Sequence, residues 1–188
     1  MKEVGDMTQQ KDNNSPDENK ENKQSSPMTP IQILLLNFLI VITILWILFG
    51  SVIGLVNAPN NDMYPNIKSK DLVLYYRLNN NYHAQDIVVL TKNNTTYIGR
   101  IVAAGGDTVD ISDSERLVIN GNTVAESGIY ASTPRFEGFV NYPVKLGKNE
   151  YFILADARNG AEDSRYYGTV SINEILGKGI TIVRRNYL

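Results

Sequence analysis

Three stretches with different patterns of apolar and polar residues follow one another along the chain. Residues 1–30 are polar, residues 31–56 are almost continuously apolar, and residues 57–188 alternate short apolar runs with Gly, Asn, Asp and Pro. The first composition cannot bury enough apolar surface to offset the entropy lost on ordering, so we expect a disordered tail. The pattern therefore predicts a tail, an apolar helix and one folded domain.

The apolar stretch at residues 31–56 predicts a transmembrane helix. No charged side chain occurs anywhere in residues 24–61. At about 1.5 Å of rise per residue, such a helix covers the hydrocarbon core of about 30 Å. A cleaved signal peptide would have a shorter apolar core nearer the start of the chain. Lys20 and Lys23 precede the span and weakly favour a cytoplasmic amino terminus.

The third stretch predicts a mainly β domain with antiparallel strands. Runs rich in β-branched and aromatic residues, bounded by turn residues, are typical of strands. They occupy residues 71–76, 86–90, 96–104, 108–111, 117–124, 151–154 and 179–185. Asn120-Gly121 is typical of a type I′ hairpin turn. Ser171, followed three residues later by Glu174, predicts a short helical turn.

Composition and charge remove several classes of function. Charged residues make up 20% of the chain and the formal net charge is −2, so we expect no binding to nucleic acid. The chain has no cysteine and a single histidine, His83, which argues against disulfides, thiolate or histidine metal sites and a Ser-His-Asp triad. We therefore expect neither a metal nor a cofactor.

Four segments, in this order, resemble sequence boxes of the type I signal peptidases (peptidase S26), the membrane-anchored Ser-Lys proteases that cut signal peptides. NDMYPNI at 61–67 is similar to S-M-x-P-T, and AQDIVVL at 84–90 to G-D-I-V-V. TYIGRIVAAGGDTV at 96–109 is similar to Y-I-K-R-V-V-G-L-P-G-D, and ADARNGAEDSRYYGTV at 155–170 to G-D-N-R-x-x-S-x-D-S-R. The resemblance implies a signal-peptidase-like antiparallel β domain at 57–188, outside the cell membrane, on a single N-terminal transmembrane helix.

The same resemblance identifies four positions that lack the family's catalytic side chains. Asp62 stands where the family has its nucleophilic Ser, and Gly99 where it has the Lys that acts as general base. Ala161 replaces the Ser that orients this lysine, and Asn60 replaces the Ser that assists the oxyanion. Because glycine has no group that accepts a proton, the resemblance predicts an inactive homologue. An aspartic dyad built on Asp62 is not expected, since the chain has no D-T-G or D-S-G repeat.

Other positions keep residues that the family uses for structure or for substrate. The resemblance implies structural roles, including ion pairs beside the site, for Asp156, Arg158, Asp163, Ser164 and Arg165. It implies that a shallow apolar peptide-binding pocket is lined by Met63, Ile67, Tyr97 and Ile98. For each of these four residues, ordinary burial in the core of a β domain is the alternative.

The paired Asp and Gly substitutions are similar to those of the signal-peptidase-like SipA proteins encoded in pilus loci of Gram-positive cocci. That resemblance implies a non-proteolytic, membrane-anchored chaperone or scaffold for pilus polymerisation, with pilin subunits and a sortase as partners. It would bind an extended peptide segment in the degenerate groove. Two alternatives remain open: an active signal peptidase, a serine-type endopeptidase, that uses other groups, and a structural membrane protein whose β domain docks to another chain.

Overall fold

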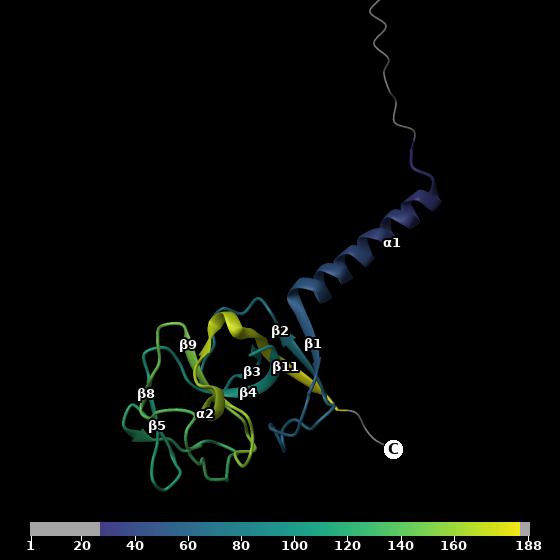
Figure 1. Cartoon of the computed structure of the whole chain (residues 1–188). Coiled ribbons are helices and arrows are strands. Elements are labelled where there is room, and N and C mark those ends of the chain that lie inside the picture. The colour runs from purple at the N-terminus through teal and green to yellow at the C-terminus, as the bar shows by residue number, and fades with distance from the viewer. Residues whose placement is uncertain (1–26, 185–188) are drawn as a thin grey trace, which may run out of the picture. The chain divides into compact units, whose positions relative to one another are not determined.

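A computed structural model describes residues 27–184, which form an N-terminal helix and a β domain (Figure 1). The predicted tail at residues 1–30 lies almost wholly outside the described residues. The β domain is mainly antiparallel, which confirms the fold class expected from the sequence.

The helix α1 (Pro30–Ile47) continues into a π-helical turn at Leu48–Val52. Its start has the features of a capping box, because the Thr29 amide donates to Gln32 Oε1 at 2.8 Å and the Gln32 amide donates to Thr29 Oγ1 at 3.3 Å. The helical segment Pro30–Val52 is long and apolar enough to cross a membrane. It ends four residues before the predicted boundary at residue 56, since residues 53–57 form a strand.

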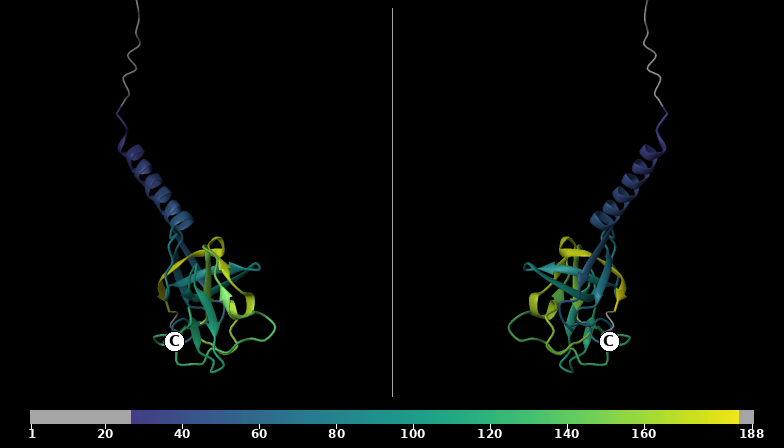
Figure 2. Two further views of the ribbon diagram at one scale, coloured as in Figure 1. Left: turned by 90° about the vertical axis from the view of Figure 1, so that its left-hand side faces the viewer. Right: turned by 90° about the vertical axis from the view of Figure 1, so that its right-hand side faces the viewer.

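Two sheets build the β domain. The larger sheet has the strand order β1 (Ile53–Asn57), β2 (Leu72–Tyr76), β11 (Ile175–Val183), β3 (Ile87–Lys92), β4 (Thr95–Ala103), β9 (Glu150–Leu154) and β10 (Val170–Ser171). The smaller sheet has the order β7 (Asn122–Thr123), β6 (Leu117–Ile119), β5 (Thr108–Ile111) and β8 (Val144–Lys145). The C-terminal strand β11, yellow in Figure 2, is thus an interior strand, paired with β2 and β3.

Local sequence signals determine the turns. Asn120 and Gly121 have φ values of 51° and 79°, the left-handed pair that a type I′ hairpin needs, and they connect β6 and β7 as predicted. Ser171 and Glu174 form a complete capping box at the 3₁₀ turn Ile172–Glu174. A second short helix, α2 (Ser164–Tyr167), begins after Asp163, whose side chain accepts a hydrogen bond from the Arg165 amide.

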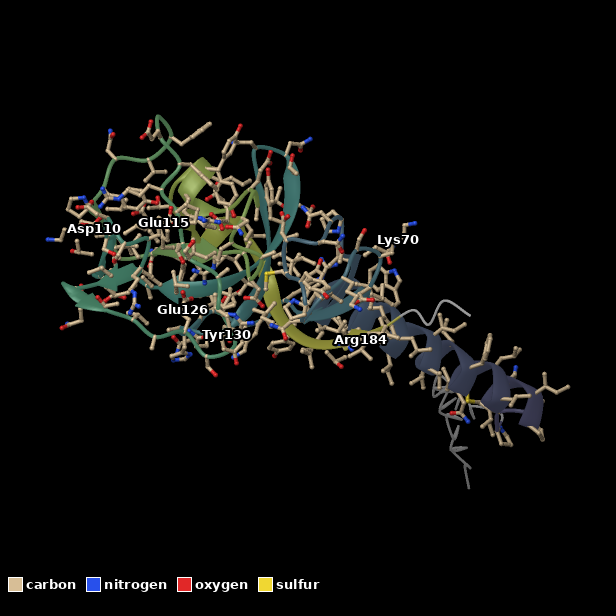
Figure 3. The ribbon with its side chains drawn as sticks, turned by 90° about the horizontal axis from the view of Figure 1, so that it is seen from below. Lys70, Asp110, Glu115, Glu126, Tyr130 and Arg184 are labelled. Atoms are coloured by element: carbon tan, nitrogen blue, oxygen red, sulfur yellow. The ribbon has the colours of Figure 1, made fainter. Side chains whose placement is uncertain are left out.

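Apolar side chains are buried on both faces of the larger sheet. On β3, Val89 belongs to one core cluster, whereas Val88 and Leu90 belong to another, because successive side chains of a strand point to opposite faces. A third cluster, which includes Phe152 and Leu117, joins the two sheets. At the end formed by the smaller sheet lie Asp110 and Glu115, and at the other end of the domain lie Lys70 and Arg184 (Figure 3).

Candidate functional site

The loop after β1 brings Asp62 against the segment that follows β9. The amide of Ala157 donates to the main-chain carbonyl of Asp62 at 2.8 Å, which fixes the loop in place. Asn60 holds the Asp62 side chain, because its Nδ2 donates to Asp62 Oδ2 at 2.7 Å and its Oδ1 accepts from the Asp62 amide at 3.1 Å. Asn60 and Asp62, two of the four positions to which the resemblance assigns catalytic side chains, are therefore bonded to each other.

The Asp62 carboxyl lies among other acids. Partial burial raises its pKa, and the nearby carboxylates of Asp163 and Glu162 raise it further, whereas the hydrogen bond from Asn60 lowers it. A raised pKa means that the folded protein disfavours the charged form of this group. No cationic side chain is among the groups that shift the pKa of Asp62.

Gly99 lies in the middle of β4, opposite Val88 of β3, at a position that the neighbouring core fills. A Cβ atom added there would lie 2.5 Å from Ile153 Cγ2 and 3.3 Å from the carbonyl oxygen of Leu154. Ile153 is fully buried, and its Cγ2 is attached to the rigid Cβ branch. The space that a side chain at position 99 would need is therefore taken by Ile153, which the sequence alone did not reveal.

Ala161, the fourth of these positions, is buried and offers no polar side-chain atom. Its neighbour Glu162 accepts a hydrogen bond from the Tyr97 hydroxyl at 3.1 Å. The Tyr97 ring packs against Tyr167 with 5.0 Å between ring centroids. Burial raises the pKa of Tyr97, and the Glu162 carboxylate raises it further. Asp62, Asn60, Gly99 and Ala161 together supply one carboxylate and one amide, without an alcohol or an amine.

The residues expected to be structural are all buried, and most form ion pairs. Arg165 Nε and Nη2 donate to the two carboxylate oxygens of Asp163 at 2.9 and 2.8 Å. Asp163 Oδ2 also accepts from the amide of Ala155 at 3.0 Å, and Ser164 Oγ accepts from the amide of Ile153 at 2.9 Å. These bonds fasten α2 to the end of β9.

Asp156 pairs with Arg100, a residue that the sequence reasoning did not assign. Arg100 Nε and Nη2 donate to the two Asp156 oxygens at 2.8 and 2.7 Å, and Asn66 Nδ2 donates at 2.8 Å. The position of Arg100 directly after Gly99 in the third box was the available signal. The pair connects β4, the loop after β9 and the loop that carries Asp62.

Arg158 forms a separate buried group. Its guanidinium donates to the carbonyl of Ala155 at 2.7 Å, to Thr133 Oγ1 at 2.6 Å and to Glu126 Oε1 at 2.5 Å. Glu126, labelled in Figure 3, comes from the long connection between β7 and β8. A fully buried guanidinium needs such partners, so this group holds that connection against the core.

The four residues predicted to line a peptide pocket do not face one open surface. Met63, Ile67 and Ile98 are 2%, 1% and 7% exposed and pack in a single core cluster. Tyr97 precedes Ile98 on the strand, so its side chain lies on the opposite face and packs against the other cluster. The expectation of a shared concave surface is wrong, because adjacent strand positions cannot share a face.

An open pocket lies beside Ala161 instead. It has a volume of about 410 Å³, and its lining includes Ala161, Glu162, Phe136, Phe139 and Tyr166. The Phe139 and Tyr166 rings are 53% and 42% exposed, and their centroids are 4.2 Å apart. The sequence gives no signal for this aromatic pair, because the segment around residue 139 matches none of the four boxes.

Comparison with known proteins gives a family profile and several relatives. The profile described as signal peptidase, peptidase S26, matches residues 31–184. Signal peptidase I S of Bacillus subtilis strain 168 is 32% identical over 115 residues, which are 56% of this chain and 62% of that protein. A protein of Staphylococcus aureus strain COL named inactive signal peptidase IA is 26% identical over 156 residues, which are 78% of this chain and 87% of that protein.

The chain spans about three fifths of the length of the first relatives. The matched share is 62% of the Bacillus subtilis protein and 58% of a probable signal peptidase I-2 of Synechocystis. Among solved structures, a signal peptidase I from Enterococcus faecalis V583 aligns with a TM-score of 0.44 and 23% identity. That alignment covers 52% of this chain and 96% of the other.

Proposed function

The chain belongs to the peptidase S26 family of signal peptidases, and we propose that it is a non-proteolytic member that binds an extended peptide segment. Where the family resemblance places nucleophile and general base, the chain has a half-buried carboxylate, Asp62, and a glycine whose side-chain space is filled by Ile153. Proton transfer from a serine to a lysine therefore has no groups to act through at these positions.

The size of the loss argues against slow cleavage by the family mechanism. Removal of one member of a nucleophile and base unit costs on the order of 10⁴ to 10⁶ in rate, and removal of the others adds little because they act as a unit. An alternative is an active serine-type endopeptidase that uses other groups. Its support is the family membership and the similarity to signal peptidase I S of Bacillus subtilis.

Peptide binding does not need the missing groups. An extended peptide is held by main-chain hydrogen bonds to a strand edge and by pockets for alternate side chains. The pocket next to Ala161 supplies two exposed aromatic rings, Phe139 and Tyr166, with Glu162 on its wall. Aromatic rings of this kind contribute a large contact area at low entropic cost. We place the apolar anchor of the bound segment here rather than at Met63, Ile67 and Ile98.

The proposed setting is the cell surface. The apolar helix Pro30–Val52 would anchor the chain in a single pass, with the amino terminus in the cytoplasm and the β domain outside. The similarity of the Asp and Gly substitutions to those of pilus-locus proteins supports a role as chaperone or scaffold in pilus polymerisation, with pilin subunits and a sortase as partners. The relative from Staphylococcus aureus named inactive signal peptidase IA is consistent with a non-proteolytic role.

The test measures binding and cleavage on the same samples. Full-length protein in detergent is mixed with a fluorescent peptide that spans a signal-peptide cleavage site, and anisotropy and mass spectrometry are recorded. We expect a rise in anisotropy and no product. Phe139→Ser should weaken binding, whereas Leu78→Ser, which replaces another exposed apolar residue, should not. Product formation would support the active peptidase, and absence of both signals would support a structural membrane protein.

A further inference from the structure

The helix α1 carries three amide or hydroxyl side chains, at Gln32, Asn37 and Thr43. Gln32 Oε1 accepts a hydrogen bond from the amide of Thr29, and Thr43 Oγ1 donates to the carbonyl of Leu39 at 2.8 Å. Within residues 27–184, the side chain of Asn37 has no hydrogen-bond partner and is exposed. Among these three side chains, Asn37 is therefore the one that forms no hydrogen bond within the described residues.

The position of Asn37 makes this costly in a membrane. It lies seven residues inside the start of the segment Pro30–Val52, which corresponds to a depth of about 10 Å along the helix. This is within the hydrocarbon core, where no water is present to bond an amide. Polar side chains in such segments face a protein partner rather than lipid.

Asn37 also lies on a regular seam of the helix. The spacing from Ile33 to Asn37, Ile40, Ile44 and Ile47 is four, three, four and three residues, the heptad spacing of paired helices. Between residues 33 and 47, all Leu, Phe and Trp side chains lie off this seam. A β-branched seam interrupted by one Asn is the pattern in which the polar residue determines register and partner number.

We propose that α1 pairs in parallel with α1 of a second copy of this chain, with Asn37 bonded to Asn37. All copies insert in the same direction, so their Asn37 side chains lie at the same depth. The amide group contains both a donor and an acceptor, so two copies satisfy each other across a two-fold axis. The pairing rests on the membrane anchoring in the proposed function, but it does not depend on the identity of the bound peptide.

The absence of cysteine from the sequence makes the pairing directly measurable. Single cysteines are introduced into the full-length chain on the seam, at Ile33, Ile40 and Ile44, and off the seam, at Leu35 and Ile42. Oxidation in native membranes should give disulfide-linked dimers several-fold more efficiently at the seam positions. Equal cross-linking at all positions, or cross-linking of seam cysteines to a different protein, would overturn the proposal.

The role of Asn37 is tested by fluorescence transfer between labelled copies in liposomes. Asn37→Leu should weaken dimerisation about 3- to 30-fold, the range found for interhelical polar contacts in membranes. Asn37→Gln should retain most of it, and Thr43→Val is the matched control, because Thr43 is bonded within its own helix. Unchanged dimerisation in Asn37→Leu would refute the role of the amide.

Extraction of the membranes with carbonate distinguishes failure of the membrane anchor from failure of the helix pairing alone. Loss of the protein from the membrane pellet would refute the anchor, and with it the pairing. Retention in the pellet without seam-specific dimers would refute the pairing alone.

Discussion

Substitution of Gly99 by alanine tests whether the position that the family resemblance assigns to the general base is closed to a side chain. The added methyl group would lie 2.5 Å from Ile153 Cγ2 and 3.3 Å from the Leu154 carbonyl oxygen. Ile153 is fully buried and surrounded by a core cluster, so its side chain cannot move away without disturbing the packing. Overpacking of this kind costs about 1–3 kcal/mol, and the lower chain entropy of alanine in the unfolded state offsets about 0.4–1 kcal/mol. We expect Gly99→Ala to lower the free energy of unfolding by about 1–2 kcal/mol.

A second variant distinguishes a steric clash from a backbone effect. Ile153→Ala removes Cγ2 and should itself cost about 2–5 kcal/mol. In that background the methyl group at position 99 has room, so Gly99→Ala should be neutral or should stabilise by up to about 1 kcal/mol. The coupling energy between the two substitutions should then be about 1–3 kcal/mol.

The unchanged chain, the two single variants and the double variant are compared by urea unfolding in detergent. Near-ultraviolet circular dichroism monitors the unfolding of each full-length protein. A destabilisation of the same size in both backgrounds would show that the backbone of β4, not Ile153, disfavours a side chain. Stabilisation by Gly99→Ala in the otherwise unchanged chain would show that the position is open. Either result would remove the steric part of the argument against a proton acceptor at position 99.

Further predictions concern the acid, the ion pair, the core and the pocket. The raised pKa of Asp62 means that its ionised form destabilises the fold above that pKa, so Asp62→Asn should raise the free energy of unfolding at pH 7. This gain in stability should vanish as the pH falls through the pKa of Asp62 in the folded protein toward its ordinary pKa of about 3.9. A gain of the same size at pH 7 and pH 4 would contradict the raised pKa. Arg165→Met leaves the Asp163 carboxylate buried without its partner and should cost about 3–5 kcal/mol in urea unfolding, whereas a cost below 1 kcal/mol would contradict the pairing. Ile98→Arg places a charge in a site only 7% exposed, so the variant should lose its cooperative thermal unfolding transition or melt at a much lower temperature. An unchanged melting temperature would show that Ile98 lines an open groove. Tyr166→Ser should weaken peptide binding several-fold at an unchanged melting temperature, and unchanged binding would move the binding surface elsewhere.

Much of the architecture could be predicted because its signals are local. The hairpin at Asn120-Gly121 depends on two residues that tolerate positive φ, and the capping box at Ser171 depends on one residue pair. Strand β1 was missed because its residues continue the apolar stretch of the membrane helix, so hydrophobicity alone does not mark the change. It forms as a strand because residues 53–57 pair along their length with β2.

The candidate site was predictable only in its residue identities. The resemblance predicts that Asp62 and Gly99 stand where the family has its nucleophile and base. The closure of position 99, by contrast, depends on a side chain more than fifty residues away, at Ile153. The grouping of Tyr97 with Ile98 failed because adjacent residues of a strand point to opposite faces, which the predicted strand at 96–104 already implied. The aromatic pair of Phe139 and Tyr166 arises from two segments that only the fold brings together.

Binding without cleavage can be measured in a single-turnover experiment. Full-length protein in liposomes is incubated in large excess over a labelled precursor with an intact signal peptide, and the mature product is quantified over many hours. Signal peptidase I S of Bacillus subtilis, prepared in the same way, is the positive control. We expect precursor bound to the liposomes and a cleavage rate at least about 10⁴-fold below that control, the order expected for loss of a nucleophile or its base. Correct cleavage at a rate within about 10²-fold of the control would contradict the proposed non-proteolytic role, since residual catalysis of that size requires a working nucleophile and base.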